Sequence, residues 1–336
     1  MIYQIFALSS YDMGKIKVSG SFSSLKFHLL RYGRVFVVYD RNVESYLEKV
    51  ASGKPAMAID ADEAHKTIDT VMGICRWLMA QGADRKSVVL AVGGGVTSDM
   101  VGFAAAIYKR GIAYINIPTT LLAMVDAGIG GKTGVNLDGC KNQIGVFKQP
   151  EFTYICPRFL STLPEREIRS GAAEMIKTFI IKDEGNYDKA LKLFSEPFDI
   201  AAAEPLIAAA AKVKADIVRK DEFETGGRRV LNLGHTYGHA VEWWQLTTGA
   251  PDPYTHGEAV AIGLVRAAVK SEALGVAKSG LAEKIRADLS YCGLPTEMPC
   301  SDAEIEEALR QDKKSESGKI HFVLIKSIGN VTVKKI

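Results

Sequence analysis

The feature that most constrains the fold is an alternation of short apolar runs with helical stretches across roughly the first 155 residues. The apolar runs are RVFVVYD (34–40), PAMAID (55–60), KSVVLAV (86–92) and IAYINIP (112–118). Between the second and the third, the segment 63–82 shows helical periodicity and ends at Gly82. Strands that alternate with helices predict a parallel sheet with helices on both faces.

Beyond about residue 158 the long segments are helical in pattern. They are 164–183, which opens with Pro164, the alanine-rich 201–211, and 301–314. The last of these begins with the capping-box pair Ser301 and Glu304, and the terminal stretch predicts a hairpin around Gly329-Asn330. We therefore predict an α/β domain over residues 1–157, followed by a mainly helical domain over 158–336 that ends in a hairpin.

Length and composition narrow the class of protein. A chain of 336 residues fits two domains, and 47% hydrophobic with 24% charged residues is typical of globular proteins. A net charge of +3 without a block of like charges argues against a nucleic-acid partner. Five cysteines without C-x-x-C spacing argue against a disulfide framework. Because no signal peptide or membrane span is evident, we expect a cytoplasmic enzyme.

The strongest candidate for a nucleotide site follows the run at 86–92. That run leads directly into GGGVTSD (93–99) and then into an apolar helix. Glycines let the backbone approach a ligand closely, and the helix start offers N–H groups to phosphate. The spacing is not G-x-G-x-x-G, so a tight turn without a ligand is the alternative. A second glycine-rich loop, 118–136, carries Asp126 and Lys132 in a segment otherwise short of charge.

The helical half carries candidates for a metal site. His235 and His239 are four residues apart at the start of a predicted helix, which puts both rings on one face. Glu174 and Lys177 share a face of another helix, and His256 begins a third. A carboxylate with two or three imidazoles suits zinc or a similar divalent ion. The spacing does not decide which histidines are ligands.

Single residues support a plainer interpretation. Any one of these histidines, taken alone, is more typical of a structural or surface residue than of a metal ligand. Three basic residues, taken individually, are typical of solvated surface charges: Lys66, Lys214 and Arg228.

Seven motifs occur in the order found in one enzyme family, across roughly residues 40 to 320. They are GGGVTSDMVGFAAAIYKRG, IPTTLLAMVDAGIGGKTGVN, KNQIGVF, FLSTLPERE, GAAEMIK, LNLGHTYGHAVE and HGEAV. In this set the chain resembles the 3-dehydroquinate synthases of the sugar-phosphate cyclase superfamily. The resemblance implies a Rossmann-like, NAD-binding parallel-sheet domain followed by a mainly helical metal-binding domain, usually in a homodimer.

The resemblance also assigns residues to roles. It implies one zinc or cobalt ion held by Glu174, His235 and His256, with His239 beside the substrate instead. The NAD residues that it implies are Asp40, Asn42, Glu63, Lys66, Gly94, Gly95, Val96, Asp99, Thr119, Thr120, Asp126, Lys132, Lys141 and Thr162. The substrate residues that it implies are Arg110, Asp126, Lys132, Asn142, Lys177, Lys214, Glu224, Arg228, Asn232 and His239, together with Lys313 or Lys314.

The implied reaction belongs to the shikimate pathway of aromatic amino acid biosynthesis. Its substrate, 3-deoxy-D-arabino-heptulosonate 7-phosphate, carries a phosphate and a carboxylate, which lysine and arginine suit. NAD oxidises the substrate transiently, phosphate leaves by β-elimination, the hydride returns, and an aldol closure of the opened ring gives 3-dehydroquinate. The net reaction is that of a lyase, in which NAD is regenerated at each turnover.

Some positions depart from the family pattern. The departures are Ala127-Gly128-Ile129 in the second glycine-rich loop, Cys140 before Lys141, Cys156, and a long segment at 243–255. They bear on loop geometry, and they remove no implied ligand or charged contact.

Three other functions are alternatives to the synthase. A sedoheptulose 7-phosphate cyclase acts on a substrate without the carboxylate, so it need not keep Lys214, Arg228 and His239 together. A metal- and NAD-dependent polyol or glycerol-phosphate dehydrogenase would release NADH. A non-catalytic NAD-binding module would have no need of the complete set of site residues.

Overall fold

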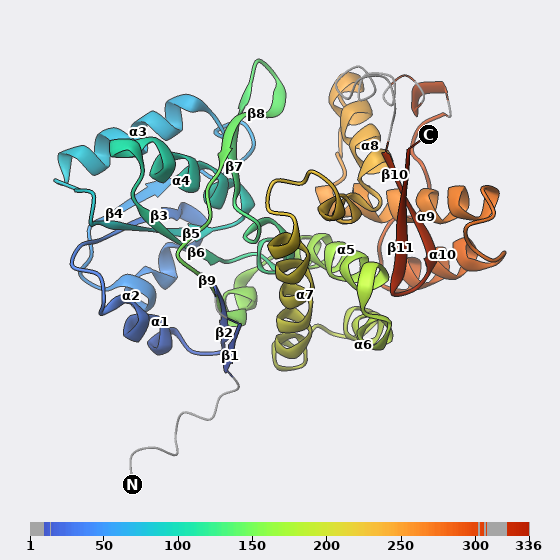
Figure 1. The fold of residues 1–336 in the computed structure, drawn as a ribbon, viewed down its shortest axis with the longest axis horizontal. Coiled ribbons are helices and arrows are strands. Elements are labelled where there is room, and N and C mark those ends of the chain that lie inside the picture. The colour runs from blue at the N-terminus through green and yellow to red at the C-terminus, as the bar shows by residue number, and fades with distance from the viewer. Residues whose placement is uncertain (1–9, 14, 302, 306, 308–320, 336) are drawn as a thin grey trace, which may run out of the picture. The chain divides into compact units, whose positions relative to one another are not determined.

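The computed structural model describes residues 10–13, 15–301, 303–305, 307 and 321–335, and the chain divides after Leu163 into two compact units. The first unit is built on a seven-stranded sheet in the order β1-β2-β9-β6-β5-β3-β4 (Figure 1). Its strands are β1 (Ser10–Asp12), β2 (Ile16–Ser19), β3 (Val35–Asp40), β4 (Ala56–Ile59), β5 (Val88–Gly93), β6 (Ala113–Pro118) and β9 (Thr153–Ile155). Six of these strands run parallel and only β1 is antiparallel, which confirms the predicted parallel sheet.

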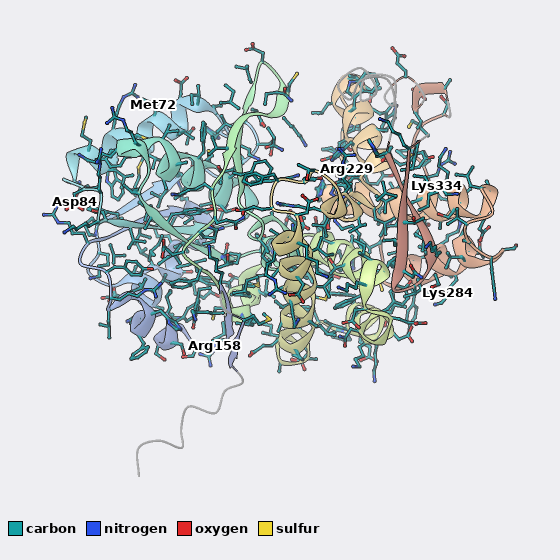
Figure 2. The ribbon with its side chains drawn as sticks, in the orientation of Figure 1. Met72, Asp84, Arg158, Arg229, Lys284 and Lys334 are labelled. Carbon is teal, nitrogen blue, oxygen red and sulfur yellow. The ribbon has the colours of Figure 1, made fainter. Side chains whose placement is uncertain are left out.

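Helices cover both faces of this sheet. They are α1 (Phe22–Leu29), α2 (Leu47–Ala51), α3 (Ile68–Ala80) and α4 (Gly95–Ile107). In Figure 1 the pair α3 and α4 lies on one side of the sheet, and α1 and α2 lie on the other. The helix α3 buries Val71, Ile74 and Leu78 against the sheet and α4, while Met72 points outward (Figure 2). Burial of one apolar stripe per helix is what holds such layers together.

Shorter elements connect the strands. They are the 3-10 helices η1 (Arg41–Tyr46), η2 (Tyr108–Arg110) and η4 (Pro157–Thr162), the π-helical turn η3 (Ala123–Ala127), and the strands β7 (Lys132–Leu137) and β8 (Cys140–Phe147). The strands β7 and β8 form an antiparallel hairpin that sequence patterns had not indicated. It turns at Asp138 and Gly139, whose φ angles of 48° and 78° suit the two-residue turns of tight hairpins.

Two boundaries differ from the sequence-based expectations. The helix expected from residue 63 begins at Ile68, because the side chain of Thr67 caps it by accepting a hydrogen bond from the Thr70 amide. The division between the units lies beyond residue 157, because Phe159 of η4 packs against the rings of Phe22 and Tyr46.

The second unit is mainly helical. Its elements are α5 (Glu165–Lys182), α6 (Glu184–Ser195), α7 (Ile200–Lys220), η5 (Gly227–Asn232), α8 (His235–Thr248), α9 (His256–Ala273), α10 (Leu281–Tyr291), β10 (His321–Ser327) and β11 (Asn330–Lys335). The helix α5 is buried along most of its length and packs against α6, α7 and α9. The strands β10 and β11 pair as an antiparallel hairpin, and Arg229 of η5, labelled in Figure 2, contacts His321 of β10.

The segment after α10 is only partly described. Ser301 and Glu304 exchange the two hydrogen bonds of a capping box, as their spacing predicts. Lys313 and Lys314, one of which was expected to contact the substrate, lie outside the described residues. Within the part of the chain that is described, no helix has the length and apolar character that spanning a membrane requires.

Candidate cofactor and metal sites

The glycine-rich loop of the first unit lies at the carboxyl ends of the parallel strands. The strand β5 ends at Gly93, and α4 starts two residues later with Gly94 as its N-cap. The amide of Thr119, just after β6, donates to the Gly93 carbonyl over 2.9 Å. A Cβ on Gly94 would lie 3.2 Å from Cγ2 of Thr120, so the loop and the end of β6 are packed closely. This is the edge at which open α/β sheets bind nucleotides.

Lys66 is the most buried charge of this unit, with 4% of its surface exposed. Its Nζ donates to Oδ2 of Asp99 and to Oδ1 of Asn142, each over 2.6 Å. Asn136, which the sequence did not single out, accepts from the Asn142 amide over 2.9 Å and donates to Oε1 of Glu63 over 2.8 Å. The interpretation of Lys66 as a surface charge is therefore wrong, because its ammonium group joins a polar network across three segments.

The other predicted residues of this unit are spread over its loops and strand ends. Asp40 is the last residue of β3 and accepts hydrogen bonds from both the amide and the side chain of Asn42. The remaining positions are Gly95 and Val96 in the first turn of α4, Arg110 in η2, Asp126 in η3, Lys132 at the start of β7, Lys141 in β8 and Thr162 in η4. Arg110 has a left-handed backbone, with φ of 69°.

In the second unit three potential metal ligands converge. Glu174 lies in the middle of α5, His235 is the first residue of α8, and His256 is the first residue of α9. One ligand atom from each lies within 4.8 Å of the other two. Oε1 of Glu174 is 3.3 Å from Nε2 of His256 and 3.7 Å from Nε2 of His235. A carboxylate and two imidazoles in this arrangement match a three-ligand site with an open position.

Two glycines of α9 explain why the three helices meet so closely. A Cβ on Gly257 would lie 1.9 Å from the backbone oxygen of Ser170 in α5. A Cβ on Gly263 would lie 1.9 Å from the backbone oxygen of Gly234, just before α8. No larger residue fits at either position, because a neighbouring backbone would have to move. The helix α9 therefore touches both partner helices through backbone atoms beside the candidate ligands.

The environment of Glu174 suits a cation. Its carboxylate is fully buried, forms an ion pair with Lys177, and accepts no hydrogen bond of good geometry from the described residues. Burial acts to raise the pKa of Glu174, but Lys177 and His256 outweigh it and lower that pKa to about 2. A buried carboxylate that stays ionised needs positive charge beside it, which a divalent ion would supply.

The two histidines of this group are oriented by their second nitrogens. Nδ1 of His235 donates to the carbonyl oxygen of Leu233 over 3.2 Å, and Nδ1 of His256 faces Oε1 of Glu242 at 3.5 Å. Burial acts to lower the pKa of His256, but Glu174 and Glu242 raise it to about 10. Both Nε2 atoms are thereby directed toward Glu174, as in carboxylate–histidine–metal arrangements.

Glu242 was missed by the sequence analysis. It is seven residues after His235 and three after His239, so all three share one face of α8. That spacing was available in the sequence, but a third position on the face did not by itself indicate contact with His256.

His239 lies next to the ligand group without belonging to it. Its ring centroid is 5.3 Å from that of His235 and 6.5 Å from that of His256. Among the described residues, the group that could hold a metal comprises Glu174, His235 and His256. Helical spacing had left His235 and His239 equivalent, and the structure separates their positions.

Buried positive charge accompanies this group. Lys177, Lys214 and Arg228 are 1%, 6% and 3% exposed, so the interpretation of the last two as surface charges is wrong. Nη1 of Arg228 donates to the backbone oxygen of Glu222, which holds its side chain against the loop before η5.

Two further predicted substrate residues pair with each other in this region. Nδ2 of Asn232 donates to Oε1 of Glu224 over 2.8 Å. Glu224 has a left-handed backbone, with φ of 58°, so the loop that carries it adopts a specific shape.

Comparisons with known proteins show the family of this chain. The family model for the N-terminal part of 3-dehydroquinate synthase matches residues 56–170, and that for the C-terminal part matches 171–315. A 3-dehydroquinate synthase of Acidithiobacillus ferrooxidans is 43% identical over 326 residues, covering 93% of this chain and 87% of the relative. One from a Synechococcus species is 44% identical over 283 residues, covering 82% and 76%.

A solved structure shows the same fold. It is the 2-epi-5-epi-valiolone synthase ValA of Streptomyces hygroscopicus subsp. jinggangensis, with NAD+ and Zn2+ bound. The TM-score is 0.85 at 30% identity, and the match covers 97% of this chain and 92% of the other. The sequence matches to 3-dehydroquinate synthases are higher in identity and extend through both compact units. The chain therefore belongs to the 3-dehydroquinate synthase family of the sugar-phosphate cyclase superfamily.

Proposed function

We propose that this chain converts 3-deoxy-D-arabino-heptulosonate 7-phosphate into 3-dehydroquinate and phosphate, with NAD and one divalent metal ion. The observation that carries the proposal is the group formed by Glu174, His235 and His256, in a chain whose relatives are 3-dehydroquinate synthases. A buried, ionised carboxylate facing two oriented imidazoles is the donor set of a catalytic zinc site.

The metal site is the first part of the proposal. Glu174, His235 and His256 would hold a zinc or cobalt ion, and a structural relative is described with Zn2+ bound. When bound, such an ion lowers the pKa of a substrate hydroxyl. Lys177 contributes by holding Glu174 ionised, since its Nζ pairs with the carboxylate.

The NAD site is the second part. When bound, NAD takes up a hydride from the substrate and returns it. The first turn of α4, with Gly94 and Gly95, would present backbone N–H groups to the pyrophosphate. Lys66 would keep Asp99 and Asn142 in place, since it hydrogen bonds to both. The other residues assigned to NAD are Asp40, Asn42, Glu63, Val96, Thr119, Thr120, Asp126, Lys132, Lys141 and Thr162.

The substrate carries two anionic groups, and the chain offers buried cations for them. Lys214 and Arg228 are both less than a tenth exposed. Burial of a positive charge costs free energy, and a bound anionic group would offset that cost. His239, beside the metal group, would hydrogen bond to the substrate and move a proton. The other residues assigned to the substrate are Arg110, Asp126, Lys132, Asn142, Lys177, Glu224 and Asn232.

An assay of phosphate release tests this function. The purified protein with zinc and a small amount of NAD should release many equivalents of phosphate from the heptulosonate phosphate. Absorbance at about 340 nm should show no steady accumulation of NADH, because the hydride is returned within each turnover. NADH formed in proportion to substrate would contradict the proposal and favour a dehydrogenase.

The choice of substrate tests the role of the buried cations. Sedoheptulose 7-phosphate lacks the carboxylate, so it should be a poor substrate if Lys214 and Arg228 bind that group. Equal turnover of both substrates would place the chain among the other sugar-phosphate cyclases.

A further inference from the structure

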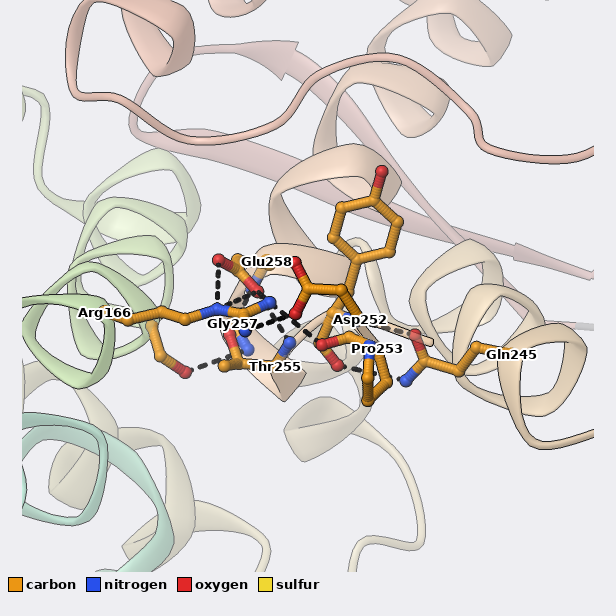
Figure 3. A network of polar contacts seen from close by, with 9 residues as sticks. Arg166, Gln245, Asp252, Pro253, Thr255, Gly257 and Glu258 are labelled. Carbon is orange, nitrogen blue, oxygen red and sulfur yellow. Dashed lines mark hydrogen bonds and ion pairs between the residues drawn. The ribbon is translucent and has the colours of Figure 1, made fainter. Parts of the chain in front are cut away.

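A polar network surrounds the first turn of α9, outside the metal group itself (Figure 3). Its centre is Arg166, in the first turn of α5, whose guanidinium group donates to four acceptor atoms on three residues. Nε and Nη2 donate to the two carboxylate oxygens of Glu258, Nη1 donates to Oδ1 of Asp252, and Nη2 also donates to the backbone oxygen of Pro253. These distances lie between 2.9 and 3.0 Å.

The acceptors come from two sides of His256. Asp252 and Pro253 belong to the loop 249–255 that joins α8 to α9, and Glu258 lies in the first turn of α9. The same Glu258 carboxylate accepts from the Thr255 amide over 2.7 Å, completing a capping box around the helix start. One arginine of α5 therefore holds both the end of the loop and the start of the helix.

Other contacts fix the residues next to His256. The side chain of Gln245 donates to the Tyr254 carbonyl over 3.0 Å and accepts from its amide over 2.8 Å (Figure 3). The amide of Gly257 donates to Oγ of Ser170 over 3.2 Å. His256 itself is the first helical residue, the position at which helices fray most readily. Its ring would be poorly positioned without contacts of this kind.

The network and the candidate metal ligands meet on one face of α5. Arg166, Ser170 and Glu174 are four residues apart in turn, so they form a single stripe along the helix. The stripe bears the arginine that holds the loop, the residue that touches Gly257, and the carboxylate that faces His256. The position of α9 along α5 therefore sets the distance between Glu174 and His256.

We propose that Arg166 is a positioning residue for the metal site, which fastens the loop 249–255 and the first turn of α9 to α5 and so holds His256 at coordinating distance from Glu174. This inference rests on the proposed function, because it takes His256 and Glu174 as ligands of one ion. The arginine touches neither of these two side chains and acts through Glu258, Asp252 and Pro253. A single exposed ion pair contributes little to stability. One guanidinium that donates to four acceptor atoms nevertheless fixes the positions of the residues that carry them.

The chain contains a matched control. Arg169 lies on the same helix and is 46% exposed, against 44% for Arg166. It forms an ion pair with Glu165, one turn earlier on the same helix, and this contact does not fasten α9 to α5. Replacing either arginine by methionine removes one positive charge and keeps most of the apolar stem. Only Arg166→Met should alter the start of α9.

The experiment measures zinc affinity by competition with a chromophoric chelator, using metal-free full-length protein and zinc ion alone. Arg166→Met should bind zinc about tenfold more weakly than the wild type, the lower end of the effect of outer contacts on a metal site. Arg169→Met should bind zinc like the wild type. Arg166→Lys should lie between them, because lysine restores the charge but cannot reach all of the acceptors.

Unfolding of the metal-free variants separates positioning from general stability. If Arg166→Met lowers the unfolding temperature but leaves zinc affinity unchanged in the folded protein, the inference is wrong. If Arg166→Met does not fold, the zinc affinity of Arg166→Lys is compared with that of Arg169→Met instead. Equal zinc affinities of these two variants would contradict the inference. A wild type that binds no zinc would contradict the proposed metal site instead, and that result is distinct from equal zinc affinities in all variants.

Discussion

The two candidate sites of this protein are built in different ways. In the first unit, the residues assigned to NAD are spread over loops, helix starts and strand ends. The nearest neighbour of a Cβ on Gly94 would be a side-chain atom of Thr120, 3.2 Å away. In the second unit, Gly257 and Gly263 bring α9 against its partners so that a Cβ would meet backbone oxygens at 1.9 Å. Side chains can shift by a few tenths of an ångström, and packed backbones cannot.

This difference in packing predicts how each site responds to substitutions. The candidate metal ligands Glu174, His235 and His256 are held by helices in backbone contact, so the loss of one ligand should empty the proposed site. The strand-end site is made of loops, short polar contacts and helix N–H groups, so single changes there should weaken binding by steps. Three predictions test this comparison.

The largest effect is expected at the metal group. His235→Ala removes one of the three candidate ligands, so the protein should lose its zinc and its activity together. His239→Ala is the matched control, because the two rings are neighbours on one helix face. It should keep its zinc and bind NAD, but turn over roughly 10²–10⁴-fold more slowly, as expected for loss of a proton-transfer group.

Metal per chain, measured by elemental analysis beside the turnover number, checks this pair. A folded His239→Ala that comes out free of zinc would show that His239 is a ligand. A His235→Ala that keeps full metal content would remove His235 from the site.

A smaller effect is expected from the backbone contact that holds α9. Gly257→Ala places a methyl group where the Ser170 carbonyl oxygen lies, so the metal-free protein should lose about 1–3 kcal/mol of stability. Gly185→Ala is the control, because the nearest neighbour of its Cβ would be 3.7 Å away and it lies in the first turn of α6. There alanine should add up to about 1 kcal/mol through helix propensity. Denaturant unfolding of both variants gives the comparison, and equal stabilities would mean that α9 can shift along α5.

Much of the fold could be predicted from local patterns. The apolar runs located β3, β4, β5 and β6, because buried parallel strands are short and continuously apolar. The start of α3 was predicted too early. The N-cap role of Thr67 depends on its extended backbone conformation, which the helical pattern of the segment does not indicate. The hairpin of β7 and β8 was missed as well, because its glycines resemble a loop in sequence.

The residues of the candidate sites were harder to predict than the fold. Single-residue reasoning treated Lys66, Lys214 and Arg228 as surface charges, because their burial depends on partners distant in sequence. Asp99 and Asn142 lie far along the chain from Lys66 and reach it only through the folded sheet. The order of the motifs, rather than the spacing, predicted Glu174, His235 and His256 as the ligands, because helical periodicity gives His235 and His239 the same face.

The smallest effect is expected in the strand-end site, at Lys66. Its ammonium group donates to Asp99 and Asn142, so Lys66→Met leaves a carboxylate that has lost a charged hydrogen bond. Because loops of this site can adjust, the protein should still fold, and its affinity for NAD should fall about tenfold, or about 1.4 kcal/mol. Zinc affinity should stay unchanged, because the candidate ligands all belong to the second unit.

Lys54→Met, at an exposed lysine of the first unit, is the control for Lys66→Met and should bind NAD normally. Fluorescence titration with NAD and chelator competition with zinc give the two affinities. Loss of zinc in Lys66→Met would show that the two sites are coupled, and unchanged NAD affinity would remove Lys66 from the NAD site.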